Sequence, residues 1–497
     1  MISKNAIQLL KTRYCREGEN PEDVYKRTAK ALSGGDSAFE DILYNLMLHK
    51  YFLPNSPALF NSGFANMMHA CCALGIEDNM ESIANFQYTL MMMFKYGAGV
   101  GVNYSKLRSK DSSLSGGGTS SGILSLMKVT EANTEYVKQG GYRRGANMSL
   151  LWYHHPEIID FVQSKLKGHF PNMNLSVMVD NYFMDRVSTD EYFEMKDPHT
   201  LKVTNKLKYK DFFDILTACA WSCGCPGLVF FDRINQDNKF YPEVIIDTTN
   251  PCAESPIPVN SLCCLGSINL SKLVKGNEFN FDKFREVLSN ATKALLNMNR
   301  IGWYPFDYMK EAMDKFKPIG TGIMGFADAL IKLGIYYDSQ DCLDFIDTIG
   351  KVYKEVTDSV AEDSFYRRIV APTGSLSILA DCSSGVEPIF SEVFERHLTV
   401  GKIEETREIY KSQYVRAAHE IAPEWHVNIQ AQWQKWVDGG ISKTINLPYS
   451  ASIDDVKHAY IQAYKLGCKG ITVYRDMSKN EQVLYAKHGC EGETCYL

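Results

Sequence analysis

From Pro54 onward the chain alternates short apolar runs with helical segments, and this alternation restricts the fold more than any other feature. Clusters of Gly, Asn and Ser separate the apolar runs, as in PNSPALFNSG, FKYGAGVGVNYS and SGGGTSSG. Segments such as GILSLMKVTEANTEYVK space their apolar residues by three and four, which indicates helices. Repeated strand, loop and helix predict an α/β body, built as a barrel or as a doubly wound sheet.

Three regions follow from the pattern along the chain. Residues 1–53 carry helical spacing in NPEDVYKRTAKAL and AFEDILYNLMLHKYF, so we expect an N-terminal helical region. Residues 54–476 form the predicted α/β body. Residues 477–497, MSKNEQVLYAKHGCEGETCYL, are polar and include Cys490 and Cys495, which favours a flexible tail.

Composition excludes several classes of protein. The net charge of −6 gives no basic surface for nucleic acid. We find no apolar run of about 18 residues and no secretory leader, so we expect a cytoplasmic protein without membrane contact. The 14 cysteines are too dilute for a disulfide scaffold. Cys219, Cys223 and Cys225 lie close in sequence but lack a Cys/His pair at ligand spacing, so we expect no metal site.

The segment NPCAESPIPVNSLCCLGSINL, residues 250–270, gathers reactive side chains. Asn250, Cys252 and Glu254 alternate, and in extended backbone such residues point to one side. Pro251 favours an edge or a loop because it donates no backbone N–H. Cys263 and Cys264 follow shortly after. The spacing predicts a reaction centre on a loop inserted into a cavity.

Two glycine-containing patterns could bind phosphate groups. Gly320-Thr-Gly322-Ile-Met-Gly325 has the form of a dinucleotide fingerprint, but a helical segment and Pro318 stand where the preceding strand should be. We therefore expect these glycines to allow tight backbone packing before the helix FADALIKLG. In APTGSLS, residues 371–377, hydroxyl groups crowd an expected helix start, which fits either an anion site or ordinary N-capping.

A series of segments resembles the large, catalytic chain of ribonucleotide reductases. They are NPCAE followed by CCLGSINL, PNSPALFNSG, CALGIEDNMESI, KYGAGVGVN, KQGGYRRGAN, GTGIMGFADAL, APTGSLSIL with SSGVEPIF, and GCKGITVYRD. They cover most of the chain from Pro54 to Asp476. The resemblance implies a ten-stranded α/β barrel with a central finger loop, and it places Cys252 at the tip of that loop.

The resemblance also implies a role for each residue of the reaction centre. A thiyl radical on Cys252 would abstract the 3′-hydrogen of a ribonucleotide. Glu254 would act as general base toward the 3′-OH, and Asn250 would hold the sugar hydroxyls. Cys71 and Cys263 match the two thiols that reduce the 2′ position and end as a disulfide. Cys72 and Cys264 have no assigned role.

Substrate, reductant and effector sites follow from the same resemblance. The expected substrate-binding residues are Ser56, Ala70, Pro372, Thr373, Gly374, Ser375 and Ser377. Cys490 and Cys495 resemble a shuttle pair that thioredoxin or glutaredoxin reduces. A deoxynucleoside triphosphate effector would bind near the interface of a homodimer, in elements at about residues 120–180. Its expected contacts are Lys138, Arg143, Arg144, Lys165 and Lys167.

Two departures from the family pattern concern regulation and the radical source. Only 53 residues precede Pro54, so we expect a short form without the N-terminal ATP cone. Members that pair with a metal-containing radical subunit carry two adjacent tyrosines near the last barrel strand, whereas the segment Lys469–Tyr474 here has one. GCKGITVYRD resembles the adenosylcobalamin-dependent (class II) members, which makes adenosylcobalamin the expected cofactor.

Three alternatives stay open at this level. The same catalysis could belong to a class I alpha subunit, with no cofactor in this chain and the radical supplied by a separate small subunit. A nicotinamide-dependent dehydrogenase is the rival enzyme. A catalytically silent nucleotide-binding regulator is the rival non-enzyme, although the set Asn250, Cys252, Glu254, Cys71 and Cys263 argues for catalysis.

Overall fold

A computed structural model of the chain describes residues 2–65, 67–137, 145–398, 401–478 and 484–486. The helices are α1 (Lys4–Leu9), α2 (Pro21–Leu32), α3 (Ser37–Leu48), α4 (Ser56–Asn61), α5 (Met80–Lys95), α6 (Ile123–Tyr136), α7 (Ile158–Gln163), α8 (Asn181–Met184), α9 (Tyr209–Cys223), α10 (Phe231–Gln236), α11 (Phe281–Ile301), α12 (Asp307–Phe316), α13 (Phe326–Leu333), α14 (Gln340–Val360), α15 (Leu376–Ala380), α16 (Pro423–Gln434) and α17 (Ile453–Lys465). Among these described helices, we find none with the length and apolarity needed to cross a lipid bilayer.

The strands are β1 (Phe52–Pro54), β2 (Cys71–Leu74), β3 (Gly99–Asn103), β4 (Asn147–Trp152), β5 (Met173–Val179), β6 (Tyr192–Lys196), β7 (Val203–Lys208), β8 (Gly227–Phe230), β9 (Cys264–Asn269), β10 (Val274–Lys275), β11 (Glu278–Phe279), β12 (Ile319–Met324), β13 (Val393–Leu398), β14 (Gly401–Thr406), β15 (Thr444–Leu447), β16 (Gly470–Arg475) and β17 (Leu484–Ala486). This mixture confirms the expected α/β class.

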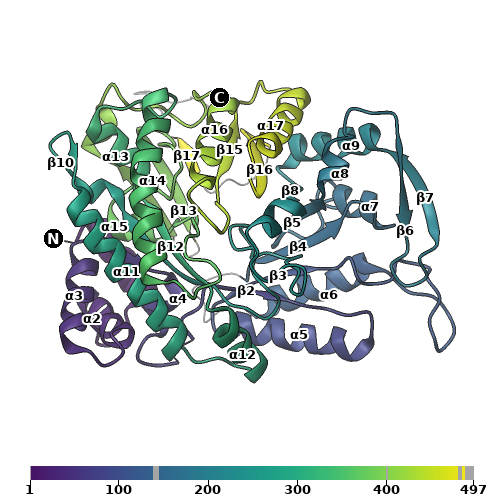
Figure 1. The fold of residues 1–497 in the computed structure, drawn as a ribbon, viewed down its shortest axis with the longest axis horizontal. Coiled ribbons are helices and arrows are strands. Elements are labelled where there is room, and N and C mark those ends of the chain that lie inside the picture. Colours follow the sequence, from purple (N-terminus) through teal and green to yellow (C-terminus); the bar gives the residue numbers. More distant parts are fainter. Residues whose placement is uncertain (1, 66, 138–144, 399–400, 479–483, 487–497) are drawn as a thin grey trace.

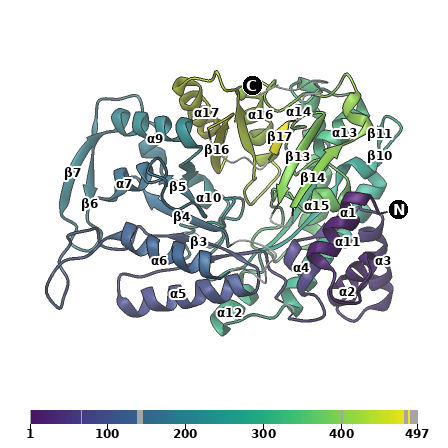
Figure 2. The same ribbon diagram turned by 180° about the vertical axis from the view of Figure 1, so that it is seen from behind.

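The N-terminal helices pack at one end of the molecule, beside α11, whereas the β6–β7 hairpin lies at the opposite end (Figures 1 and 2). Helix α2 begins at a capping box, in which Asn20 and Asp23 exchange side-chain and backbone hydrogen bonds. Its buried face, which includes Val24, Tyr25 and Leu32, packs against α3 and α11. The apolar spacing seen in the sequence therefore forms the predicted helical region.

Two sheets form the body. The larger has seven strands in the order β15-β16-β8-β5-β4-β3-β2, and the smaller has three in the order β1-β9-β12. Strands β2, β3, β4, β5 and β8 run parallel, while β16 pairs antiparallel with β8. Helices α5 and α6 lie along β2, β3 and β4 (Figures 1 and 2). Parallel strands covered by helices explain why these strands are buried along almost their whole length.

Isolated pairings connect the edges of the two sheets. Cys72 pairs antiparallel with Leu262, which lies just before the smaller sheet's strand β9 and is separated from it by Cys263. On the other side, Thr321 of β12 pairs with Arg368, and Val370 pairs with Ile441, just before β15. The smaller sheet is thus connected to β2 on one side and, through residues 368–370, to the segment before β15 on the other.

A central loop, residues 247–262, passes between the two sheets, and glycines give it room. A Cβ atom at Gly101 of β3 would lie 1.5 Å from the carbonyl oxygen of Thr249. At Gly99 it would lie 2.6 Å from the Pro251 ring, and at Gly440 it would lie 2.9 Å from the Glu254 carbonyl oxygen. Backbone packs on backbone here, which only glycine permits.

Two further sequence predictions can be compared with the fold. The pattern from Gly320 to Gly325 forms β12 and the turn before α13, and a Cβ at Gly320 would lie 2.4 Å from Leu265. These glycines therefore serve close packing, as expected. Residues 477–497 were expected to form a tail without packing, but β17 within that stretch pairs with β13. Backbone pairing with the edge of β13 supplies the contact that its polar side chains did not indicate.

We expect Gly101→Ala to destabilise the protein, because the new methyl group would overlap the Thr249 carbonyl oxygen. The free energy of unfolding should fall by about 1–3 kcal/mol, measured by chemical denaturation. Gly116→Ala is the control, since nothing lies within 4 Å of a Cβ placed there. Equal stability of the two variants would show that the loop does not depend on Gly101.

Candidate active site

The backbone around Cys252 forms a tight turn. The amide of Ala253 donates to the carbonyl of Asn250 at 3.0 Å, and Ala253 has a φ of 64°. The expectation of extended backbone with three side chains on one side is therefore wrong, because the chain reverses at Pro251 and Cys252. The turn leaves Cys252 exposed while Asn250 and Glu254 are buried.

Asn250 connects the turn to the thiol of Cys71. Its Nδ2 donates to Cys71 Sγ at 3.4 Å, and its Oδ1 accepts from the backbone N–H of Ser255 at 2.9 Å. The amide orientation is fixed by this pair of bonds, since only the oxygen can accept.

Cys71 and Cys263 lie side by side across the pairing that joins β2 to the central loop. The amide of Cys263 donates to the Cys71 carbonyl at 2.8 Å. Burial, with a hydrogen bond and charge repulsion from the Cys71 thiol, raises the pKa of Cys263 well above its usual range. Both thiols belong to an inner cluster of buried side chains, whereas Cys72 and Cys264 point into the separate outer core. Strand alternation therefore separates the two pairs.

Glu254 sits among these groups and is only 2% exposed. Its carbonyl accepts from the amide of Gly440 at 2.7 Å, which fixes the loop to the segment before β15. Its charge also helps to raise the pKa of Cys263. The structure thus brings Asn250, Glu254, Cys71 and Cys263 together around the turn that carries Cys252.

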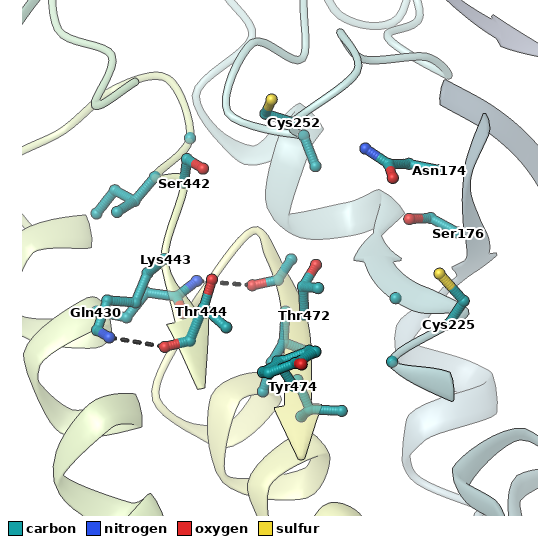
Figure 3. A pocket seen from close by; sticks show the side chains of 18 of the residues that line it. Asn174, Ser176, Cys225, Cys252, Gln430, Ser442, Lys443, Thr444, Thr472 and Tyr474 are labelled. Carbon is teal, nitrogen blue, oxygen red and sulfur yellow. Dashed lines mark hydrogen bonds between the residues drawn. The ribbon is translucent and has the colours of Figure 1, made fainter. Parts of the chain in front are cut away.

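Cys252 lines a cavity of about 390 Å³ (Figure 3). The cavity is bounded by the Cys252 turn, by Asn174 and Ser176 of β5, by Ser442, and by Thr472 and Tyr474 of β16. Its wall also contains apolar side chains, including Met148, Phe390, Ile441 and Val473. This size lies within the range of small-ligand pockets, about 300–1,000 Å³.

The hydroxyl-rich segment 372–377 forms a loop followed by the short helix α15. Ser375 is its N-cap residue, so the helix starts within the segment where the sequence indicated a helix start. Thr373 has a φ of 53°, and its Oγ1 accepts from the amide of Gly385 at 2.7 Å. Ser377 Oγ bonds Ser384 Oγ at 2.9 Å. Thr373 and Ser377 therefore shape the loop, while Pro372 is exposed and Gly374 and Ser375 are half-buried.

The remaining predicted substrate residues lie on neighbouring elements. Ser56 opens α4, and its Oγ bonds the Tyr14 hydroxyl at 2.8 Å. Ala70 is buried beside the thiol pair, and its amide donates to the Cys263 carbonyl at 3.2 Å.

The described part of the predicted effector site is the segment from Lys165 to Asn174. Lys165 Nζ donates to the carbonyl of Phe170, and Lys167 lies 3.6 Å from Asp160. At the end of the segment, Asn174 Nδ2 donates to the Pro251 carbonyl at 2.8 Å. This segment therefore leads directly to the Cys252 turn. Lys138, Arg143 and Arg144 lie outside the described residues, as do Cys490 and Cys495.

Sequence reasoning placed Asn174 at the end of the expected effector loop but not in contact with the Cys252 turn, and it did not indicate the contacts of Arg13 and Tyr14 with predicted substrate residues. Arg13 Nη1 donates to Ser375 Oγ at 2.8 Å, although the two residues are far apart in sequence. No local pattern identifies such contacts. Gly99 and Gly101, by contrast, alternate in KYGAGVGVN, and this spacing could have indicated close backbone approach on one face of a strand.

We expect iodoacetamide to label Cys252 faster than Cys263 in the folded protein at pH 8, by on the order of tenfold or more. Cys252 is exposed, whereas burial raises the pKa of Cys263 and keeps that thiol protonated, so its labelling should increase only at more alkaline pH. Mass spectrometry of the labelled peptides measures both rates, and denaturant should make them similar. Fast labelling of Cys263 in the folded state would contradict this geometry.

Comparison with known proteins identifies the family. The family model "Ribonucleotide reductase, barrel domain" matches residues 69–364 and 354–474. The family model "Ribonucleotide reductase, all-alpha domain" matches residues 1–67. Vitamin B12-dependent ribonucleoside-diphosphate reductase of Thermoplasma acidophilum is 37% identical, over 98% of this chain and 71% of its own length. The protein of the same description from Mycobacterium tuberculosis is 32% identical, over 99% and 82%. Vitamin B12-dependent ribonucleotide reductase of Streptomyces coelicolor is 27% identical, over 90% and 60%. The chain therefore belongs to the ribonucleotide reductase family, as a large chain with an all-alpha domain followed by the barrel domain.

Proposed function

We propose that this chain reduces ribonucleotides to 2′-deoxyribonucleotides with a thiyl radical on Cys252. The observation that carries the proposal is the arrangement of Asn250, Glu254, Cys71 and Cys263 around the turn that exposes Cys252. A dehydrogenase or a silent binding protein has no use for an exposed thiol beside a buried dithiol and a buried carboxylate.

The chemistry balances with these groups alone once the radical is present. The Cys252 thiyl radical takes the 3′-hydrogen, and Glu254 takes the proton of the 3′-OH and returns it to the 3′ oxygen at the end of the cycle. The 2′-OH then leaves as water with a proton from the thiol pair. Cys71 and Cys263 supply two electrons and two protons in total, one proton leaving in the water and the other forming the new 2′ C–H bond, and they end as a disulfide. Cys252 returns its hydrogen to the 3′ carbon, so the thiyl radical is regenerated.

Burial suits the thiol pair to this role. A reductant that must give protons should stay protonated at neutral pH, and burial raises the pKa of Cys263 in that direction. Asn250 bridges the pair to the turn, because its Nδ2 already contacts Cys71 Sγ. A sugar bound over the turn would replace that weak sulfur contact with a stronger hydrogen bond to a hydroxyl.

We also infer that the strands form a ten-stranded barrel around a central finger loop. The seven strands of the larger sheet, β9 and β12 would be joined by residues 368–370 as the tenth. Pairings at Cys72, Thr321 and Val370 support closure, and the glycine contacts of the central loop support its position inside. The division into residues 1–53, 54–476 and 477–497 belongs to the same inference.

Adenosylcobalamin is the cofactor that we propose as the radical source. When bound, it would supply the radical that oxidises the Cys252 thiol. The cavity of about 390 Å³ beside Cys252 fits the adenosyl part in size and in its mainly apolar wall. Ser176, Ser442 and Gln430 line it and would hold polar groups there. The relatives from Thermoplasma acidophilum and Mycobacterium tuberculosis are vitamin B12-dependent reductases, which supports the same choice.

A separate radical-generating subunit is the second candidate source. The observation in its favour is that Tyr474 lines the cavity that Cys252 also lines. Against it, the cavity wall next to Tyr474 carries Thr472 and Val473, so the adjacent tyrosine pair is missing.

A homodimer and a deoxynucleoside triphosphate effector complete the proposal. Helices α5 and α6 pack together and expose large apolar side chains, Met80, Tyr88, Val129 and Tyr136, which suits an interface between two copies. Residues 138–144 follow α6, and the segment 165–174 ends at the Asn174 contact with the Cys252 turn. This contact offers a path from effector to substrate.

The first test is ribonucleotide reduction by the purified chain with and without adenosylcobalamin. We expect product only with the cofactor, and none from Cys252→Ser, because a hydroxyl holds its hydrogen too strongly to form the radical.

Cys263→Ala should stop multiple turnover. Cys264→Ala is the matched control, since it removes the neighbouring thiol on the outer face. Product from Cys252→Ser would disprove the radical assignment, and a requirement for a second protein would favour the other radical source.

The second test concerns specificity. We expect dATP, dTTP and dGTP each to change the relative affinities for the four ribonucleotide substrates, and each favoured substrate to tighten its effector by the same factor. Asn174→Ala should reduce that coupling without abolishing effector binding, because it removes only the contact with Pro251. Unchanged substrate affinities under every effector would show that the chain has no specificity site.

A further inference from the structure

Arg13 is a buried cation beside the segment proposed to bind the substrate phosphates. It lies in the π-helical turn Leu10–Tyr14 of the N-terminal helical region and is 9% exposed. Its Nη1 donates to Ser375 Oγ at 2.8 Å, whereas its Nε is buried without a hydrogen-bond acceptor. The guanidinium therefore contacts Ser375 through Nη1, while its Nε–H donor has no acceptor.

The charges around α15 make Arg13 an exception. Other cations there have carboxylate partners: Lys50 contacts Asp381, Arg396 lies 2.5 Å from Glu405, and Arg407 lies 2.6 Å from Asp328. Within the described ranges, no carboxylate oxygen lies within 4.0 Å of Arg13. A buried charge without a counter-charge is costly, so its persistence indicates an anionic ligand.

Local structure explains how Arg13 reaches this place. Helix α1 packs against α15, and the π-helical turn that follows packs against α4. The extra residue in such a turn shifts the side chains after it, and π-turns are frequent at functional sites. Arg13 and Tyr14 thereby point to two different predicted phosphate-binding residues, since the Tyr14 hydroxyl bonds Ser56 Oγ at 2.8 Å.

We propose that Arg13 binds the phosphate group of the nucleotide substrate and so makes the N-terminal helical region part of the substrate site. This inference rests on the proposed function for the identity of the ligand. A guanidinium gives two parallel N–H donors to one phosphate, and Nε–H with an Nη–H forms such a pair. Ser375, already bonded to Nη1, lies beside the same phosphate. Recognition of charge then comes from Arg13, and the hydroxyls of the loop supply orientation.

The test compares Arg13→Gln with Lys11→Gln. Both substitutions remove one positive charge from the same turn, but Lys11 is exposed and does not belong to the proposed phosphate site. Equilibrium dialysis would measure the affinity for a ribonucleoside diphosphate and for the same ribonucleoside without phosphate. We expect Arg13→Gln to weaken diphosphate binding about 10- to 100-fold, the loss of a charge-assisted hydrogen bond, and to leave nucleoside binding unchanged. Lys11→Gln should change neither.

A second readout does not depend on the nucleoside. Inorganic pyrophosphate should raise the Tm of the unaltered protein and of Arg13→Lys, which keeps the charge, but not that of Arg13→Gln. Without ligand, Arg13→Gln should unfold at a Tm no lower than the unaltered protein, because it removes an unpaired buried charge. If Arg13→Gln does not fold, Arg13→Lys provides the test instead. It should bind diphosphate more weakly than the unaltered protein, because only arginine can form a bidentate pair with phosphate.

Two outcomes would overturn the inference. One is diphosphate affinity in Arg13→Gln within twofold of the unaltered protein. The other is an equal loss of nucleoside and diphosphate affinity, which would indicate a structural role. A failure of the proposed function would give a different result. The unaltered chain would then still bind nucleotides with an affinity that depends on Arg13, but it would form no deoxyribonucleotide with either radical source.

Discussion

Close backbone contact between the central loop and its two walls is the constraint on which the candidate site depends. Gly101 on one wall and Gly440 on the other leave room for the loop's carbonyl groups, and the Gly440 amide binds the Glu254 carbonyl at 2.7 Å. Side chains at these glycines would push the loop away from the thiol pair. Since loop backbone must be hydrogen-bonded when buried, these contacts also explain how a loop can cross the interior at all.

The chemistry of the thiols follows from the alternation of side chains along paired strands. Cys71 and Cys72 are adjacent, as are Cys263 and Cys264, and the antiparallel pairing at this point puts one member of each pair on the inner face. The inner thiols therefore lie together, as the proposed reductant pair requires, while the outer ones pack as small apolar side chains. Burial raises the pKa of Cys263 and shields both inner thiols from oxidants in solution.

How much of the fold and of the candidate site could be predicted from the sequence depends on how far apart in the chain the interacting residues lie. Helical spacing gave α2, α3 and α6 correctly, because one face of each helix is buried. The thiol pair, Asn250 and Glu254 came from motifs and resemblance, not from geometry. The extended backbone expected at 250–254 was wrong, since Pro251 and the positive φ of Ala253 form a turn, and alternation of residue types does not distinguish the two. Contacts between distant segments, such as Asn174 with Pro251, have no local signal.

The proposed phosphate contact of Arg13 would couple the N-terminal helices to the substrate site in energetic terms. Residues 1–67 match an all-alpha domain, which by itself would suggest a domain that supports the barrel without contributing to the substrate site. Yet its π-helical turn carries an unpaired cation to Ser375 of the barrel domain, and the Tyr14 hydroxyl beside it bonds Ser56 at the start of α4. A buried charge that only a ligand neutralises makes the unliganded contact weaker than the liganded one, so the substrate itself would stabilise the packing of α1 on α15. The same linkage would let the position of the N-terminal helices report whether the phosphate site is filled, because anything that shifts one equilibrium must shift the other.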